Sequence, residues 1–202
     1  MVQGKIDDLG KAFGWPWIPV KFHETAPSEP AQEKRFCEAI WDGRATPIVL
    51  TADSVTCPGA KRSFGWSRGM DEALAEDLST SQGVMLGTAK KALKRVPFLA
   101  NETVAVEVGT HDVPDILISY AQPTTLMKLA RAYEKDGDEP LRPVLSSILS
   151  VCGCAAVRSY MEGDVTVSLG CQISRETGSI GRDRLVVSVP WNKVDALIEA
   201  SY

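Results

Sequence analysis

The chain has 202 residues, of which 44% are hydrophobic and 24% are charged, so it can bury a core as a single compact domain or as two close lobes. Its formal net charge of −4 argues against nucleic-acid binding, which depends on Lys and Arg side chains that neutralise phosphates. The sequence shows neither a signal-peptide pattern nor an apolar run of about 18 residues, so we expect a cytoplasmic protein with reduced thiols that does not enter the membrane.

The predicted elements alternate between strands and helices. Pro16 and Pro19 place the first strand at a sheet edge, because proline cannot donate a hydrogen bond to a neighbouring strand. In chain order, the pattern predicts a strand at 17–22, a helix that ends at Gly43, a strand at 46–52, a short helix after Cys57, helices at 70–78 and 81–96, and strands at 101–109 and 114–121.

A strong amphipathic helix is predicted after Pro123, with its apolar residues on one face. The strand–turn–helix unit that it closes has the form in which α/β sheets bind ligands, with Tyr120, Gln122 and Thr124 lining the turn. Ordinary capping of the helix by Gln122 and Thr124 is the alternative interpretation.

The loop at 136–143 is the candidate boundary between two lobes. A short helix is predicted after the CGC segment at 152–154, followed by strands at 164–171 and 184–190 joined by a Gly-rich loop, and by a C-terminal helix. We therefore expect an α/β or α+β fold, in which helices pack on a mixed β-sheet.

The common catalytic motifs are missing from this sequence, which has no G-x-S-x-G elbow, no P-loop and no G-x-G-x-x-G fingerprint. The only two histidines, His23 and His111, are too few for a zinc site built on several imidazoles, and we expect both on the surface. The five cysteines are the remaining candidates for chemistry.

The cysteines occupy four separate segments of the chain. Cys37 fits a buried position on the apolar side of its helix. Cys57 precedes Pro58 and is predicted to be the N-cap of a helix, which stabilises a thiolate. Cys154 is predicted at another helix start, and Cys171 at the end of a strand. Such placement favours a soft metal centre, and a cubane cluster tolerates dispersed ligands better than a zinc site, which usually has C-x-x-C pairs.

Several motifs, in this order, resemble the domain of unknown function family 169 from about residue 15 to the C-terminus. They are WIPVKF, EKRFCEAIWDGR, CPGAKRSFGW, PDILISYAQPTTLMKLARAYE, DVTVSLGCQISRETG and RLVVSVPW. The resemblance implies an uncharacterised stand-alone protein of the kind found mainly in anaerobic archaea and bacteria.

The cysteine-bearing motifs of this family map onto Cys37, Cys57, one member of the CGC pair, and Cys171. Together with the resemblance, the thiol positions imply a 4Fe-4S cluster bound by Cys37, Cys57, Cys154 and Cys171, with Cys152 as the alternative ligand. We expect a role in redox chemistry, electron transfer or sensing, with a redox partner or a small anionic ligand. The oligomeric state and the reaction are not indicated by the sequence.

Two other interpretations stay open. The chain could be a metal-free binding module for a small molecule or cofactor, with a thiol-lined pocket and with Lys61, Arg62 or Arg175 as charge partners. It could also be a thiol redox enzyme that uses the closely spaced Cys152 and Cys154.

Overall fold

A six-stranded β-sheet forms the centre of the computed structural model, which describes residues 2–202 except 68, 70, 101–102, 137–139 and 179. The strand order is β2-β3-β1-β4-β6-β5, and every pair of neighbouring strands is antiparallel. The first strand therefore pairs on both sides, with β3 and with β4, and its predicted position at a sheet edge is wrong. The strands are β1 (Ile18–His23), β2 (Ile48–Thr51), β3 (Ala105–Val108), β4 (Ile116–Ala121), β5 (Thr166–Ser168) and β6 (Leu185–Pro190).

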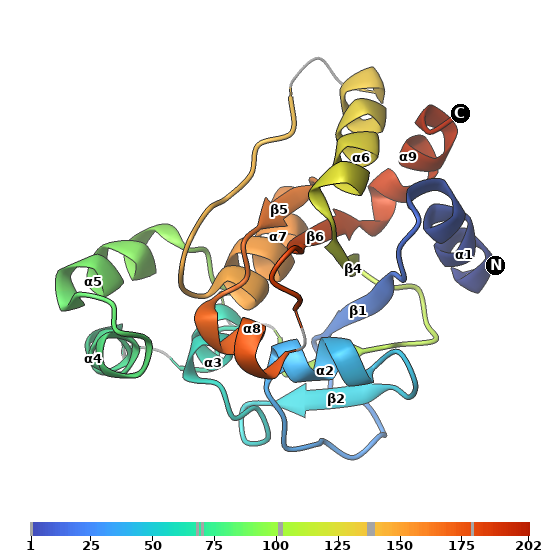
Figure 1. The fold of residues 1–202 in the computed structure, drawn as a ribbon. Helices are drawn as coiled ribbons and strands as arrows, with labels where there is room; N and C mark the ends of the chain where they lie inside the picture. The colour runs from blue at the N-terminus through green and yellow to red at the C-terminus, as the bar shows by residue number, and fades with distance from the viewer. Residues whose placement is uncertain (1, 68, 70, 101–102, 137–139, 179) are drawn as a thin grey trace.

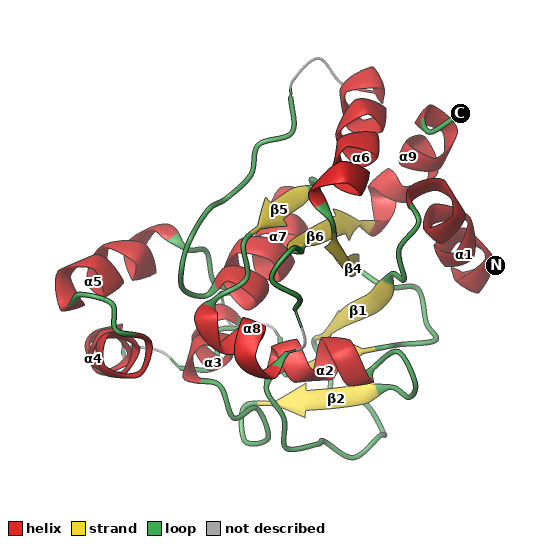
Figure 2. Ribbon diagram, viewed as in Figure 1, coloured by secondary structure: helices red, strands yellow, loops and turns green. Residues whose placement is uncertain are grey.

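Helices cover both faces of this sheet (Figure 1). One face carries α2 (Phe36–Asp42), α3 (Pro58–Ser63), the π-helix η1 (Ser150–Val157), α7 (Arg158–Glu162) and α8 (Gln172–Thr177). The hairpin of α4 (Asp71–Gln82) and α5 (Leu86–Arg95) projects from the same side of the molecule, as Figure 2 shows. The other face carries α1 (Val2–Phe13), α6 (Pro123–Asp136), the 3-10 turn η2 (Trp191–Lys193) and α9 (Val194–Ala200).

The described residues form a hydrophobic core on each face of the sheet. Successive side chains of a strand point to opposite faces, so β1 sends Val20 and Phe22 into the larger core and turns Lys21 and His23 the other way. The larger core contains Cys37, Cys152 and Cys154, together with apolar residues of α3 and α5. The smaller core joins α1, α6 and α9 to strands β4, β5 and β6.

The predicted combination of helices with a β-sheet is confirmed, and the antiparallel pairing makes it an α+β arrangement. Among the described residues, parallel pairing is confined to isolated bridges such as Ala31 with Val49. The single-domain prediction and the lobe boundary at 136–143 stay predictions, and residues 137–139 of that boundary lie outside the described residues.

Two predicted features around Cys171 differ from the structure. The Gly-rich segment that was predicted as a plain connection between two strands contains helix α8. Strand β5 therefore ends at Ser168, and Cys171 is not the last residue of a strand but the N-cap of α8. None of the helices in the described residues is both long and apolar enough to cross a membrane.

Candidate functional site

Three of the five cysteines lie at the starts of short helices on the same face of the sheet. Cys57 is the N-cap of α3 with Pro58 at the first helical position, as the sequence predicts. Cys171 is the N-cap of α8, and Cys37 is the second residue of α2. Figure 1 shows α2, α3 and α8 close to one another, although their sequences are far apart. All five cysteines are free thiols.

The CGC segment forms a π-helix, η1, rather than the start of an ordinary helix. It follows Leu149, which adopts the left-handed conformation with φ 53°, and all eight of its residues are buried. A Cβ atom at Gly153 would lie 2.3 Å from Val96 Cγ1 and 3.2 Å from Ser63 Oγ, so only glycine allows η1 to pack this closely. Single π-helical segments are rare and are frequently found at functional sites.

The thiols of Cys37, Cys57 and Cys171 interact with one another electrostatically. Burial, together with the neighbouring thiols of Cys171 and Cys57, raises the pKa of Cys37 to about 12. Burial also raises the pKa of Cys57, and the Cys171 thiol contributes to this rise. The backbone N–H groups of Ala60 and Gly59 lower the same pKa. The helices that carry these thiols are neighbours as well, since α2 packs against α8 and η1, and α3 packs against η1.

Cys152 belongs to the same group of thiols. Its pKa is raised by burial and then by the thiol of Cys57, with a smaller contribution from Cys171. Its Sγ lies 3.4 Å from Ser63 Oγ, and Ser63 also lies 2.8 Å from the carbonyl oxygen of Gly59 in α3. The hydroxyl group thus ties Cys152 to the helix that begins at Cys57.

Cys154 lies in a different environment, although it is only two residues away. Burial raises the pKa of its thiol, a hydrogen bond with Ser146 and the charge of Arg158 offset part of that rise, and the resulting pKa is about 11. The thiol of Cys171 also acts on it. Of the predicted ligand set, Cys37, Cys57 and Cys171 stand on helices of the same face of the sheet, and Cys57 contributes to the raised pKa of Cys152.

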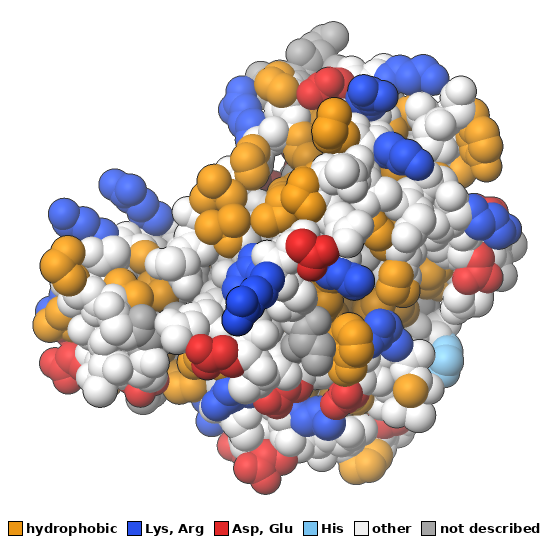
Figure 3. Space-filling view, viewed as in Figure 1, with side chains coloured by type: hydrophobic (Ala, Val, Ile, Leu, Met, Phe, Trp, Pro, Cys, Tyr) orange, Lys and Arg blue, Asp and Glu red, His pale blue; other side chains and the backbone are white. Residues whose placement is uncertain are grey.

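Side chains around the thiols hold the three helices in place. Tyr120 Oη donates to the carbonyl oxygen of Cys37 over 3.3 Å. A Cβ atom at Gly178 would lie 2.8 Å from Cys37 Cβ, so the end of α8 fits tightly against α2. Figure 3 shows Lys and Arg side chains next to Asp and Glu side chains over α8. The charge of Arg35 acts on the Cys57 thiol and lowers the pKa of that thiol.

Two arginines that the sequence suggested as charge partners have structural roles. Arg62 is buried and donates to Val96 O over 3.1 Å, to Leu93 O, and to Asp71 Oδ1 over 3.0 Å. Arg175 donates to Gly181 O over 3.0 Å, to Arg184 O over 3.1 Å, and to Leu169 O. Arg62 thus joins α3 to the end of α5, and Arg175 joins α8 to the loops on either side of it.

The turn predicted to bind a ligand lies at the start of α6, where Gln122 bonds to the helix through its backbone. The carbonyl oxygen of Gln122 accepts from the backbone N–H groups of Thr125 and Leu126, while its side chain donates to Asp183 Oδ2 over 2.7 Å. In the described residues, no three His, Cys, Asp or Glu side chains lie close enough together to bind one metal ion.

Comparison with known proteins finds relatives, and their descriptions name no activity. A family model described as "Uncharacterised ArCR, COG2043" matches residues 16–200. The uncharacterized protein MJ0308 of Methanocaldococcus jannaschii is 27% identical over 205 residues, covering 92% of this chain and 86% of that protein. No solved structure matches the chain. The resemblance seen in the sequence motifs is thereby confirmed.

Proposed function

Because the chain belongs to the domain of unknown function family 169, whose description assigns no reaction, we propose its function from its own thiols. We propose that Cys37, Cys57, Cys152 and Cys171 bind a 4Fe-4S cluster that serves redox chemistry, electron transfer or sensing. The observation that supports this most is that the four thiols stand on short helices that pack together on one face of the sheet, α2 against α8 and η1, and α3 against η1.

The chemistry of the donor set fits such a cluster. All four side chains are thiols, and no His, Asp or Glu shares in the set, which is the ligation usual for 4Fe-4S clusters. Thiols too far apart to share one ion still suit a cluster, because each thiolate bonds a different iron. The bound cluster would supply one-electron redox chemistry.

This chain's own residues would tune the cluster in three ways. The backbone N–H groups of Gly59 and Ala60, at the start of α3, lower the pKa of the Cys57 thiol and favour its anionic form, although no cap hydrogen bond joins them to the sulfur. The Ser63 hydroxyl contacts the Cys152 sulfur and stabilises a thiolate there. Burial of Cys37 and Cys152 would exclude water from that side, while the partly buried Cys57 and Cys171 mark the side nearer to a redox partner or a small anionic ligand.

Cys152 replaces Cys154 in this ligand set because of the neighbours of each thiol. Cys57 acts on Cys152, whereas Ser146 and Arg158 are the first neighbours that act on Cys154. Cys154 then serves as a buried thiol beside the cluster. An exchange of the two ligands would need η1 to rotate, and Gly153 packed against Val96 opposes that rotation.

The test is spectroscopic and uses anoxically purified protein. The wild type should absorb broadly near roughly 400 nm and contain about four irons and about four sulfides per chain. Cys57→Ser and Cys171→Ser should each lose most of the colour and iron. A colourless, iron-free wild type from an iron-replete anaerobic culture would contradict the proposal, and ligand affinity without metal would then favour the metal-free binding module.

A further inference from the structure

The face of the sheet opposite the thiols is only half covered by helices. Among the described residues, the core beneath α1, α6 and α9 takes strand residues from β4, β5 and β6 but none from β1, β2 or β3. On that remaining half, β1 turns Lys21 and His23 outward, and β3 turns Glu107 outward between β1 and β2. Polar side chains therefore lie beside the buried Val49 and Ala105 on this half of the sheet.

A histidine–carboxylate pair lies at the centre of this surface. His23 Nε2 is 2.9 Å from Glu107 Oε2, and their side chains are only 15% and 12% exposed. The expectation that His23 lies on the surface is therefore wrong, while His111 is exposed. A buried carboxylate is costly unless it is paired. When Glu107 accepts the proton of Nε2–H, the neutral imidazole keeps Nδ1 as a hydrogen-bond acceptor.

The pair lines a cavity of about 380 Å³, and so does the second histidine. The described lining includes the carboxylates of Glu29, Glu107 and Asp112 but no lysine or arginine. Lys21 lies next to the cavity, where its Nζ is 3.0 Å from Asp112 Oδ2 and neutralises that carboxylate. The other lining residues are Thr25, Pro27, Ser28, Pro47 and Thr110. The cavity therefore offers many acceptors and a negative potential.

Two glycines fix the loops that form one wall. Gly109 has φ +82°, and a Cβ atom there would lie 2.1 Å from Gly43 O, so the loops after α2 and β3 are in direct contact. Thr110, which follows Gly109, is buried, and its Oγ1 accepts from the backbone N–H of Asp112. This wall is pre-formed, as in most small-molecule sites.

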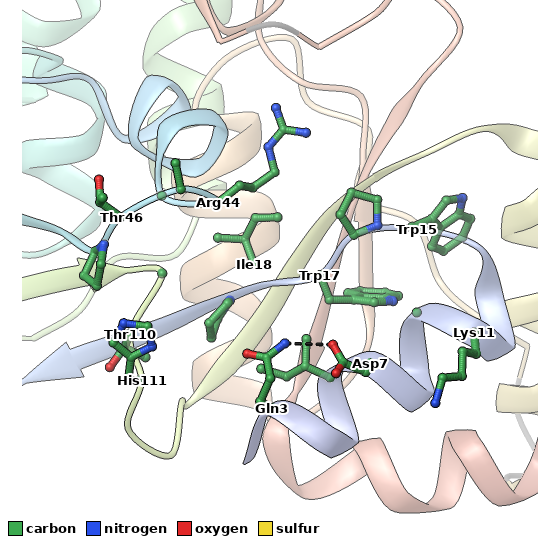
Figure 4. Close-up of a pocket in the computed structure, with 18 residues that line it drawn as sticks. Gln3, Asp7, Lys11, Trp15, Trp17, Ile18, Arg44, Thr46, Thr110 and His111 are labelled. Atoms are coloured by element: carbon green, nitrogen blue, oxygen red, sulfur yellow. Dashed lines mark hydrogen bonds between the residues drawn. The ribbon is translucent and has the colours of Figure 1, made fainter. Parts of the chain in front are cut away.

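A larger cavity of about 500 Å³ adjoins the first and shares Pro47, Thr110 and His111 with it. Figure 4 shows Thr110 and His111 at one end of the larger cavity and Lys11 of α1 at the other. Its lining includes Trp17, which is 4% exposed and whose Nε1–H has no hydrogen-bond partner among the described residues. An unpartnered buried donor is uncommon and would be satisfied by an acceptor on a ligand.

We propose that these adjoining cavities bind a small organic amine, with its ammonium group at His23 and Glu107 and an acceptor-bearing, partly apolar body in the larger cavity. The ammonium group supplies donors where the smaller cavity offers acceptors, and the prolines and Ile6 of the larger cavity accept methylene groups. This site lies on the opposite face of the sheet from the thiols and does not depend on a cluster.

The signals of the two histidines report on binding in the smaller cavity, because both line it and the chain has no other histidine. Proton NMR should show the imidazole C2–H signals shifting on titration with 5-aminopentan-1-ol, saturating with Kd on the order of 1 mM. The matched probe 1,5-pentanediol, which lacks the ammonium group, should leave the signals unchanged. His111→Gln assigns the two signals.

Two carboxylate variants complete the test. Glu29→Gln changes an exposed residue of the cavity and should weaken binding by about threefold to fivefold. Glu107→Gln should weaken it by about tenfold or more, with the fold checked by circular dichroism. Glu76→Gln, an exposed carboxylate of α4, is the control and should change nothing. Equal shifts with amine and diol, or no saturation in the wild type, would overturn the proposal.

Discussion

Replacement of Gly153 by alanine tests how the CGC segment is held. The added methyl group would lie 2.3 Å from Val96 Cγ1, far inside van der Waals contact, and 3.2 Å from the Ser63 oxygen that touches Cys152. Val96 is itself 5% exposed and has little room to move. Overpacking of this kind in a tight core costs about 1–3 kcal/mol. For a chain of this length, that lowers Tm by roughly 2–12 °C.

Thermal unfolding followed by far-UV circular dichroism under anoxic conditions measures this effect. Gly87→Ala in α5 is the matched control, because no atom lies within 4 Å of its added Cβ, and it should raise stability by up to about 1 kcal/mol. Gly153→Ala should also reduce the iron content after reconstitution, since Cys152 must shift with η1. A Gly153→Ala protein as stable as Gly87→Ala would refute the packing of η1 against Val96.

Three further perturbations follow from the same structure. Gly109→Ala should lower the free energy of unfolding by about 2 kcal/mol or more, because φ +82° strains alanine and Gly43 O leaves no space for Cβ. Urea unfolding measures this loss, and an unchanged midpoint would contradict the close approach of the two loops. Arg62→Met should destabilise the protein by about 2–4 kcal/mol, because the carbonyl oxygens of Leu93 and Val96 lose a buried partner. An unchanged midpoint in the same urea assay would contradict this, and would show that water replaces the guanidinium group. In cluster-free protein, stability should fall as pH rises from 9 towards 12, because Cys37 has a pKa of about 12 when folded and near 9.0 when unfolded, so the folded state holds the proton longer. Cys37→Ala should flatten that pH dependence of the unfolding free energy, and an equal slope in both proteins would show that Cys37 is not responsible.

Long elements with a clear period were predictable from the sequence. Strands β4 and β6 are rich in β-branched residues, and α6 has an amphipathic pattern that opens at Pro123, so both types were found close to their observed bounds. Helix α1 was not predicted, although Ile6, Leu9 and Phe13 are buried at spacings of three and four residues. That spacing was the available signal.

The short helix α8 could not be predicted in the same way. Its six residues, QISRET, are mostly polar and lack a repeating apolar position, and a helix of this length is not stable by itself. Tertiary contacts hold it, through the carbonyl bonds of Arg175 and the fit of Gly178 against Cys37. For this reason the sequence placed Cys171 at a strand end rather than at a helix start.

The sequence identified the thiols as the candidate site but not their arrangement. Which of Cys152 and Cys154 lies towards Cys57 depends on the π-helical geometry of η1 and on its packing against α3, neither of which a local pattern encodes. The His23–Glu107 pair was missed for a similar reason, because its residues come together only when β1 and β3 pair.

The most direct measurement compares the iron content of Cys152→Ser and Cys154→Ser after anoxic reconstitution of each protein. The two substitutions remove neighbouring buried thiols of one π-helix, so they share any general effect on folding. We predict that Cys154→Ser keeps about four irons per chain and its visible absorption, while Cys152→Ser loses most of both. Retention of the full cluster by Cys152→Ser would contradict the assignment of four thiols around one cluster.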